Sequence, residues 1–209
     1  MNLQEFSVEL CKVPMTRGFG AQIELLKERY GKEYVDVAEK LLELFEDLNL
    51  DAVKTARKYI YDYLKQLEYF LKHKGYGHTD YDKIREQIYD DEKTILDTYM
   101  PGLLLSYAYT TILYEKNHLY LNDFLPRIPW GGIGIEVGFG EGFYIWEALS
   151  LKHDILIHGY DISPYAIKFA KNNYKNVVEM SVTDYYEHKE KKSAKCRFFF
   201  NSKFLCRQY

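Results

Sequence analysis

The chain of 209 residues contains little cysteine and no long apolar run. Its three cysteines, Cys11, Cys196 and Cys206, are scattered and odd in number. This pattern excludes a disulfide framework and a paired-cysteine metal site, and it favours a reducing cytoplasm. No run reaches the roughly eighteen apolar residues of a membrane-spanning helix. The first residues also lack a basic start followed by an apolar stretch, so we expect no secretory signal.

Positive charge is not in excess either. The sequence has 28 lysines and arginines against 31 aspartates and glutamates, a net charge of −3. Nucleic-acid-binding proteins usually concentrate basic residues on one face, so no nucleic-acid partner is expected. Hydrophobic residues at 47% and charged residues at 28% are typical of a folded protein. We therefore expect a folded cytoplasmic protein with neither a nucleic-acid nor a membrane partner.

Residues 1–125 are predicted to form a helical region. Apolar residues recur at three- and four-residue spacing through 35–48 and again through 53–71, the pattern of one buried helical face. Asp51 is placed to cap the second of these helices, and Lys74 with Gly75 is placed to end it.

Further helices are expected after residue 79. A third helix is predicted to start near Thr79 or Asp80, and Pro101 is suited to the first turn of a new helix. Residues 103–114 are apolar nearly all round and are interpreted as one buried helix. The prolines at 126 and 129 make residues 126–131 a stiff, extended connector.

Residues 132–209 show a different pattern, in which apolar strands alternate with short helices. Strands are predicted at 133–137, 155–160, 177–182 and 198–201, and helices at 144–151 and 164–173. Alternation of this kind predicts a parallel sheet with flanking crossover helices. The fold class is therefore α/β, with an all-helical region preceding a partial parallel sheet.

The first predicted strand is followed by a glycine-rich loop. Gly138, Gly140 and Gly142 separate this strand from the next helix, and Glu136 precedes them. Glycines allow a ligand to approach the backbone closely, near the start of a helix. A dinucleotide fingerprint needs its third glycine three residues after the second, but position 143 is Phe. The spacing therefore argues against a pyrophosphate-binding loop.

Acidic residues follow the next two predicted strands. Asp161, with Ile162 and Ser163, comes directly after the second strand, and Asp184 comes after the third. A carboxylate at the end of the second strand can accept both hydroxyls of a ribose. Ser163 is also placed to cap the following helix. Because parallel strands end at one edge of the sheet, these residues are expected to lie beside the glycine loop.

This ordered set of motifs resembles the class I S-adenosylmethionine-dependent methyltransferases, which have a Rossmann-like fold. The resemblance implies that the glycines pass under the methionine part of the cofactor, Asp161 holds the ribose and Asp184 contacts the adenine amine. It also implies that Ile162 packs on the adenine ring and that Glu136 supports the loop and the ammonium side. The full set of cofactor-binding residues that it implies is Glu136, Gly138, Phe139, Gly140, Gly142, Asp161, Ile162, Ser163, Asp184 and Asn201.

The resemblance implies methyl transfer, with a small-molecule acceptor, and no catalytic base or metal ligand can be named from the sequence. Tyr107, Tyr109 and Tyr114 are candidates to line the acceptor pocket, although core positions are the alternative. Asn201 is followed by Ser202 and Lys203, not by the two prolines typical of methylases that act on nucleic-acid amines. Two other functions remain open: a non-catalytic relative that keeps the cofactor fold, and an NAD-dependent oxidoreductase.

The methyltransferase resemblance also predicts an incomplete domain. Residues 132–209 have room for about four strands, whereas the family uses seven. The tail from residue 191 is basic, has no acidic residue and contains two of the three cysteines. We expect such a chain to bind cofactor but to transfer methyl groups weakly or not at all.

Overall fold

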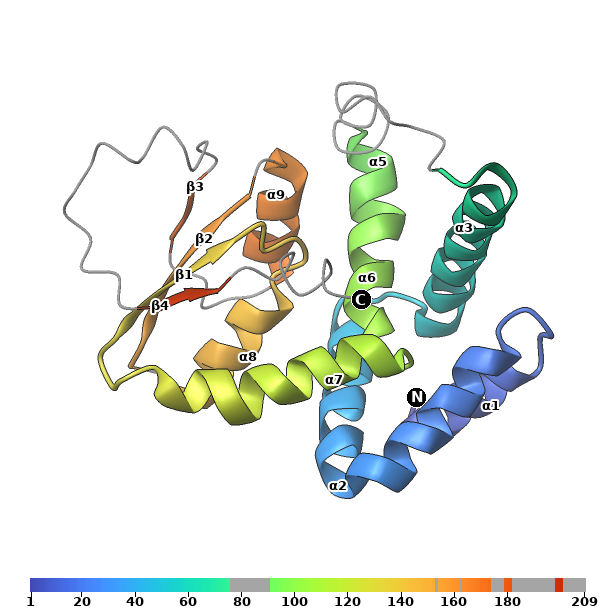
Figure 1. Cartoon of the computed structure of the whole chain (residues 1–209), viewed down its shortest axis with the longest axis horizontal. Coiled ribbons are helices and arrows are strands. Elements are labelled where there is room, and N and C mark those ends of the chain that lie inside the picture. Colours follow the sequence, from blue (N-terminus) through green and yellow to red (C-terminus); the bar gives the residue numbers. More distant parts are fainter. Residues whose placement is uncertain (76–90, 153, 162, 174–178, 182–197, 201–209) are drawn as a thin grey trace. The chain divides into compact units, whose positions relative to one another are not determined.

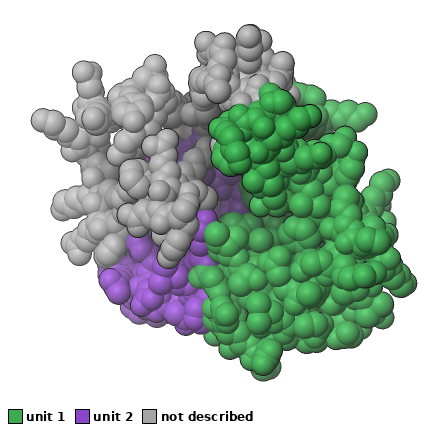
Figure 2. All heavy atoms as spheres, turned by 45° about the vertical axis from the view of Figure 1, so that its right-hand side comes forward, with its two compact units in different colours: residues 1–115 green, residues 116–209 purple. Residues whose placement is uncertain are grey.

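The computed structural model describes residues 1–75, 91–152, 154–161, 163–173, 179–181 and 198–200. It divides into two compact units, residues 1–115 and 116–209, which are coloured separately in Figure 2. The division lies within a helix, upstream of the predicted connector at 126–131. Across the described ranges, none of the helices combines the length and the apolarity needed to cross a membrane.

Unit 1 begins with a helix that the sequence analysis did not predict, α1 (Leu3–Cys11). A capping box starts it: the Asn2 side chain accepts from the Glu5 amide, and the Glu5 carboxylate accepts from the Asn2 amide. This pairing satisfies two amides that the first turn would otherwise leave without partners. Asn followed three residues later by Glu was a readable signal for this helix.

The long helix α2 (Arg17–Asp47) contains three glycines. Gly18 and Gly20 lie near its start, and Gly31 kinks it with φ 56° and ψ −132°. The predicted apolar face through 35–48 is confirmed in large part, with Ala38, Leu41, Leu42 and Phe45 all buried.

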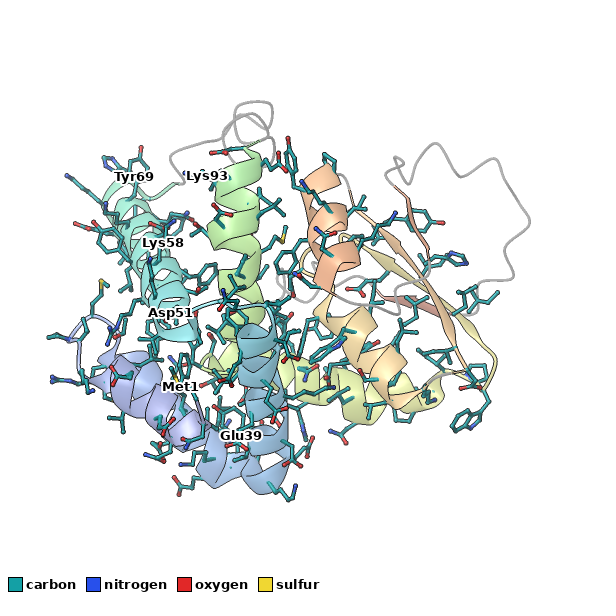
Figure 3. All side chains as sticks on the ribbon, turned by 180° about the vertical axis from the view of Figure 1, so that it is seen from behind. Met1, Glu39, Asp51, Lys58, Tyr69 and Lys93 are labelled. Carbon is teal, nitrogen blue, oxygen red and sulfur yellow. The ribbon has the colours of Figure 1, made fainter. Side chains whose placement is uncertain are left out.

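Helix α3 (Ala52–His73) confirms the predicted cap, since the Asp51 side chain accepts from the Lys54 amide at 2.9 Å. Figure 3 labels Asp51 at the start of this helix, with Lys58 and Tyr69 further along it. The left-handed residue that ends α3 is Lys74, at φ 54°, and not the glycine that follows it. The first half of the predicted apolar face is buried, but Tyr63, Leu67 and Leu71 are exposed.

The following helices are shorter than predicted. The expected start of the third helix lies outside the described residues, and the described part begins where Asp91 caps α5 (Glu92–Thr94). The chain continues through η2 (Ile95–Tyr99), α6 (Met100–Ser106), α7 (Thr111–Leu119), η3 (Tyr120–Phe124) and η4 (Leu125–Arg127). The single helix predicted over 103–114 is wrong, because the helical run is interrupted between α6 and α7.

The tyrosines considered for an acceptor pocket are core residues. Tyr107, Tyr109 and Tyr114 are all buried, and burial raises the pKa of the Tyr109 phenol well above its usual range. Tyr114 packs edge-on against the ring of Tyr34, whose hydroxyl donates to the carbonyl of Ala108. These contacts favour the core interpretation over the pocket interpretation.

Unit 2 is built around a parallel sheet, as the sequence pattern predicted. Its strands are β1 (Ile133–Val137), β2 (Leu156–Tyr160), β3 (Glu179–Ser181) and β4 (Phe198–Phe200), in the order β3-β2-β1-β4. Every pairing is parallel, and β1 runs in register with β2 from Ile133 opposite Leu156 to Val137 opposite Tyr160. The longer strands β1 and β2 are at the centre.

Two helices flank the sheet in Figure 1, α8 (Phe143–Leu151) after β1 and α9 (Pro164–Asn173) after β2. Helix α9 has the predicted bounds, and the Ser163 hydroxyl caps it by accepting from the Ala166 amide. Helix α8 packs on β2 where Gly159 lacks a side chain. A Cβ at Gly159 would lie 2.8 Å from Ile145 Cδ1 and 2.9 Å from Phe139 Cδ1.

The close packing at Gly159 gives a test of the sheet. We expect Gly159→Ala to lower the free energy of unfolding by about 1–3 kcal/mol, the cost of overpacking a core, in urea denaturation followed by circular dichroism. Gly134→Ala is the matched control on the neighbouring strand, because its Cβ would meet Ile157 Cγ1 at an ordinary 3.7 Å. Equal losses in both variants would contradict the packing of α8 on β2.

Candidate functional site

The glycine loop between β1 and α8 has a backbone shape that requires its glycines. Gly138, Gly140 and Gly142 have φ values of 70°, 58° and 77°, in the left-handed region that other residues rarely adopt. Among the residues that the structure describes, a Cβ built at Gly140 would meet nothing within 4 Å. The described part of the chain therefore leaves space beside the loop at Gly140.

Hydrogen bonds tie the loop to the end of β2. The Gly138 amide donates to the Tyr160 carbonyl at 2.6 Å, and the Gly142 amide donates to the Phe139 carbonyl at 2.9 Å. The Gly140 amide donates to Asp161 Oδ2 at 2.9 Å. Phe139, assigned to the cofactor by the resemblance, is buried with its ring against Gly159. It holds the loop against the sheet from within the core.

Asp161 connects three segments of the site. Its Oδ2 accepts from the Gly140 amide, and its Oδ1 accepts from the Ser163 amide at 2.9 Å. The sequence predicted a ligand-facing carboxylate here. In the structure this carboxylate links the loop to the start of α9 through these two hydrogen bonds. A carboxylate has about four acceptor positions, so two remain after these bonds.

Glu136 is the most unusual side chain of the site. It is 3% exposed at the end of β1, and its Oε1 has no hydrogen-bond partner. Burial raises the pKa of this carboxyl well above its usual range, and the nearby Glu141 and Asp161 raise it further. A buried acid without a partner is costly, and such groups cluster at functional sites.

Further polar groups that were not predicted to be site residues lie near Glu136 or near its neighbour Tyr120. Glu141, between two of the glycines, and Glu147, on α8, are both buried. On η3, burial and the nearby Glu136 raise the pKa of the Tyr120 phenol, which donates to the Tyr144 carbonyl at 3.2 Å. Glu147 also acts on the Tyr120 phenol. Neither residue was identifiable from the sequence, because the closeness of Tyr120 to Glu136 and Glu147 depends on how helices pack on the sheet.

Three predicted cofactor residues, Ile162, Asp184 and Asn201, lie outside the described residues. The others come together where β1 and β2 end, next to the glycine loop. Within the described ranges, no group of three or more histidine, cysteine or acidic side chains is arranged to hold a metal ion.

A separate cleft of about 400 Å³ lies within the helical unit. It is lined by Tyr59, Asp62, Tyr63, Lys65, Gln66, Thr94, Thr98 and Tyr99. Its walls come from α3 and from the run of α5 and η2. The Lys58 ammonium of α3 donates to the Thr98 hydroxyl across these two walls. Figure 3 labels Lys58 on α3 and Lys93 on α5.

Comparison with protein-family models, with curated proteins and with solved structures gives no match to this chain.

The buried Glu136 predicts a pH dependence of stability. Its raised pKa means that the folded chain keeps this proton to higher pH than the unfolded chain, so stability falls as pH rises between the two pKa values. Glu136→Gln has no proton to lose. We expect this variant to be more stable than the wild type at neutral pH, by about 1–3 kcal/mol, and the difference to shrink as the solution is acidified.

The measurement is urea denaturation at a series of pH values. Asp123→Asn serves as control, because the Asp123 side chain is 62% exposed in the same unit. A gap between Glu136→Gln and the wild type that does not change with pH would contradict the burial of a titrating carboxyl at this position.

Proposed function

We propose that residues 132–209 form the S-adenosylmethionine-binding part of a Rossmann-like, class I methyltransferase domain, and that the methyl acceptor is a small molecule. One observation carries the proposal. A parallel sheet of order β3-β2-β1-β4 brings a loop of three left-handed glycines, at the end of β1, into hydrogen-bond contact with an aspartate at the end of β2. Open α/β sheets bind their ligands at this edge.

The local chemistry favours this cofactor over NAD. The residue where a dinucleotide-binding loop needs its third glycine is Phe143, which is fully buried at the first position of α8. In that fingerprint the third glycine lets the helix pack closely on the strand, and here the Phe143 side chain occupies that place. The acidic side chains of Glu141 and Asp161 would also repel a pyrophosphate, whereas they suit a ligand that carries a sulfonium and an ammonium group.

Methyl transfer requires little of the protein beyond positioning the cofactor and the acceptor. The bound cofactor supplies an activated methyl group, and transfer is an in-line displacement that depends on holding the two partners in reach. In this chain, Gly140 leaves room for the ligand beside the loop. Asp161 holds that loop and keeps two acceptor positions for ribose hydroxyls. No general base is assigned. A non-catalytic relative with the same cofactor site is the second candidate.

The experiment that tests the proposal compares ligands of the two classes. Thermal unfolding of the full chain is followed with S-adenosylhomocysteine, with S-adenosylmethionine and with NAD. A ligand that binds only the folded state adds about 2.7 kcal/mol of stability at a hundredfold excess over its Kd. We expect stabilisation by at least one of the two adenosyl ligands and none by NAD. Stabilisation by NAD alone would refute the assignment.

A second prediction concerns the loop backbone. Gly140 and Gly131 both have positive φ, 58° and 66°, and both would place a Cβ in open space. Alanine at either position therefore costs a similar strain, about 1–2 kcal/mol. We expect Gly140→Ala to weaken cofactor binding by at least about tenfold, because the new methyl occupies the ligand's space, and Gly131→Ala to leave binding unchanged.

Isothermal titration with the two variants is the measurement, and urea denaturation checks that both are destabilised equally. If the Gly140→Ala and Gly131→Ala variants bound the cofactor with the same affinity, the glycine loop would not be the ligand cradle.

A further inference from the structure

The cleft in unit 1 has the size and the lining of a small-molecule pocket. Such pockets usually measure roughly 300–1,000 Å³ and combine apolar or aromatic walls with a few polar groups. This cleft has a volume of about 400 Å³, and the rings of Tyr59, Tyr63 and Tyr99 line it. All of its described lining residues belong to unit 1.

The floor of the cleft lies at Thr98. Among the described lining residues, only Thr98 is buried, and its exposed fraction is 7%. Tyr59 and Tyr99 are half-buried, and the other described lining residues are exposed. The cleft therefore leads from an exposed rim, past two half-buried rings, to the side chain of Thr98.

A positive charge lies at this floor. The Lys58 ammonium donates to the Thr98 hydroxyl. An ammonium has three hydrogen-bond donors, so this bond engages only one of them. The charged residues of the rim, Asp62 and Lys65, are opposite in sign and exposed, so water and salt screen their effect. The chemistry of the floor therefore favours an anionic group on the ligand.

The walls next to the floor are held by packing within unit 1. Thr98 and Tyr99 belong to η2, a turn of π-helix, and such turns are rare and frequently lie at functional sites. The Tyr59 ring packs on Gly102, where an added Cβ would lie 2.4 Å from Tyr59 Cδ2. The ring centroids of Tyr59 and Tyr99 are 6.3 Å apart. These contacts place both rings beside the floor without a ligand.

We infer that this cleft binds a flat aromatic compound with a carboxylate group, whose ring contacts the tyrosines and whose carboxylate contacts Lys58 and Thr98. Aromatic rings pair favourably in offset or edge-to-face arrangements, and a carboxylate forms strong hydrogen bonds with an ammonium. The Thr98 hydroxyl accepts from Lys58 and keeps its own proton to donate. The inference concerns unit 1 and does not depend on the function proposed for unit 2.

Ligand-observed NMR titration of the full chain provides the test. The probes are 2-naphthoate, 2-naphthalenemethanol, which has the same rings without the charge, and cyclohexanecarboxylate, which has the charge without a flat ring. We expect 2-naphthoate to bind at least about threefold more tightly than either comparison compound, because only 2-naphthoate makes both kinds of contact. Absence of 2-naphthoate binding, or binding no tighter than that of either comparison compound, overturns the inference.

A matched pair of tyrosine variants locates the aromatic contact. Tyr63 lines the cleft, whereas Tyr69, further along α3 in Figure 3, is not among the described lining residues. Both are exposed, at 51% and 45%, so leucine at either position is expected to leave the fold intact. We expect Tyr63→Leu to weaken 2-naphthoate binding by about threefold and Tyr69→Leu to leave it unchanged. Equal effects of the two variants would overturn the placement of the ring in this cleft.

A pair of lysine variants locates the carboxylate contact. Lys58→Gln removes the charge beside Thr98, and Lys72→Gln removes an exposed charge of the same helix. We expect Lys58→Gln to weaken 2-naphthoate binding by at least about threefold and to remove the preference over 2-naphthalenemethanol. Lys72→Gln is expected to change neither. If Lys58→Gln keeps the wild-type preference, Lys58 does not hold the carboxylate and the inference fails.

Discussion

The candidate site depends on the parallel pairing of β1 with β2. Because Val137 lies opposite Tyr160, the two strands end together, and the residues that follow them meet at one edge. The bonds from Gly138 to Tyr160 and from Gly140 to Asp161 continue this pairing beyond the strands. If the register slipped by one residue, every side chain of the strand would move to the other face and the loop would lose its anchor.

Packing beneath the loop supports the same arrangement. Gly159 lets the Phe139 ring and Ile145 lie directly on β2, so the loop and the first turns of α8 share one core. The apolar contacts and the hydrogen bonds together hold the loop against the sheet. The loop is bordered by the buried acidic side chains of Glu136, Glu141 and Asp161. That combination is the basis of the function proposed for this site.

Much of unit 2 was predictable from its sequence because its signals are local. Ser163 and Pro164 mark the start of α9, and the spacing of glycines after Val137 marks the end of β1. The role of Asp161 in holding the glycine loop was not predictable. Its bond from the Gly140 amide depends on strand register and not on spacing along the chain.

The helices of unit 1 were harder to predict, because the interruptions between them leave no mark in the composition. The break between α6 and α7 falls in a uniformly apolar stretch, where periodicity gives no boundary. The α3 face is apolar throughout, yet only its first half is buried among the described residues.

The kink at Gly31 has a consequence for the size of the helical unit. A straight helix of 31 residues would be about 46 Å long. A compact body of about 115 residues has a radius of gyration of only about 13 Å, so such a rod would extend well beyond it. The bend divides α2 into two arms, and both supply buried side chains, Ile23 and Leu26 before it and Tyr34 and Val37 after it. One residue without a side chain thus allows both arms of a long helix to pack against the core of the same unit.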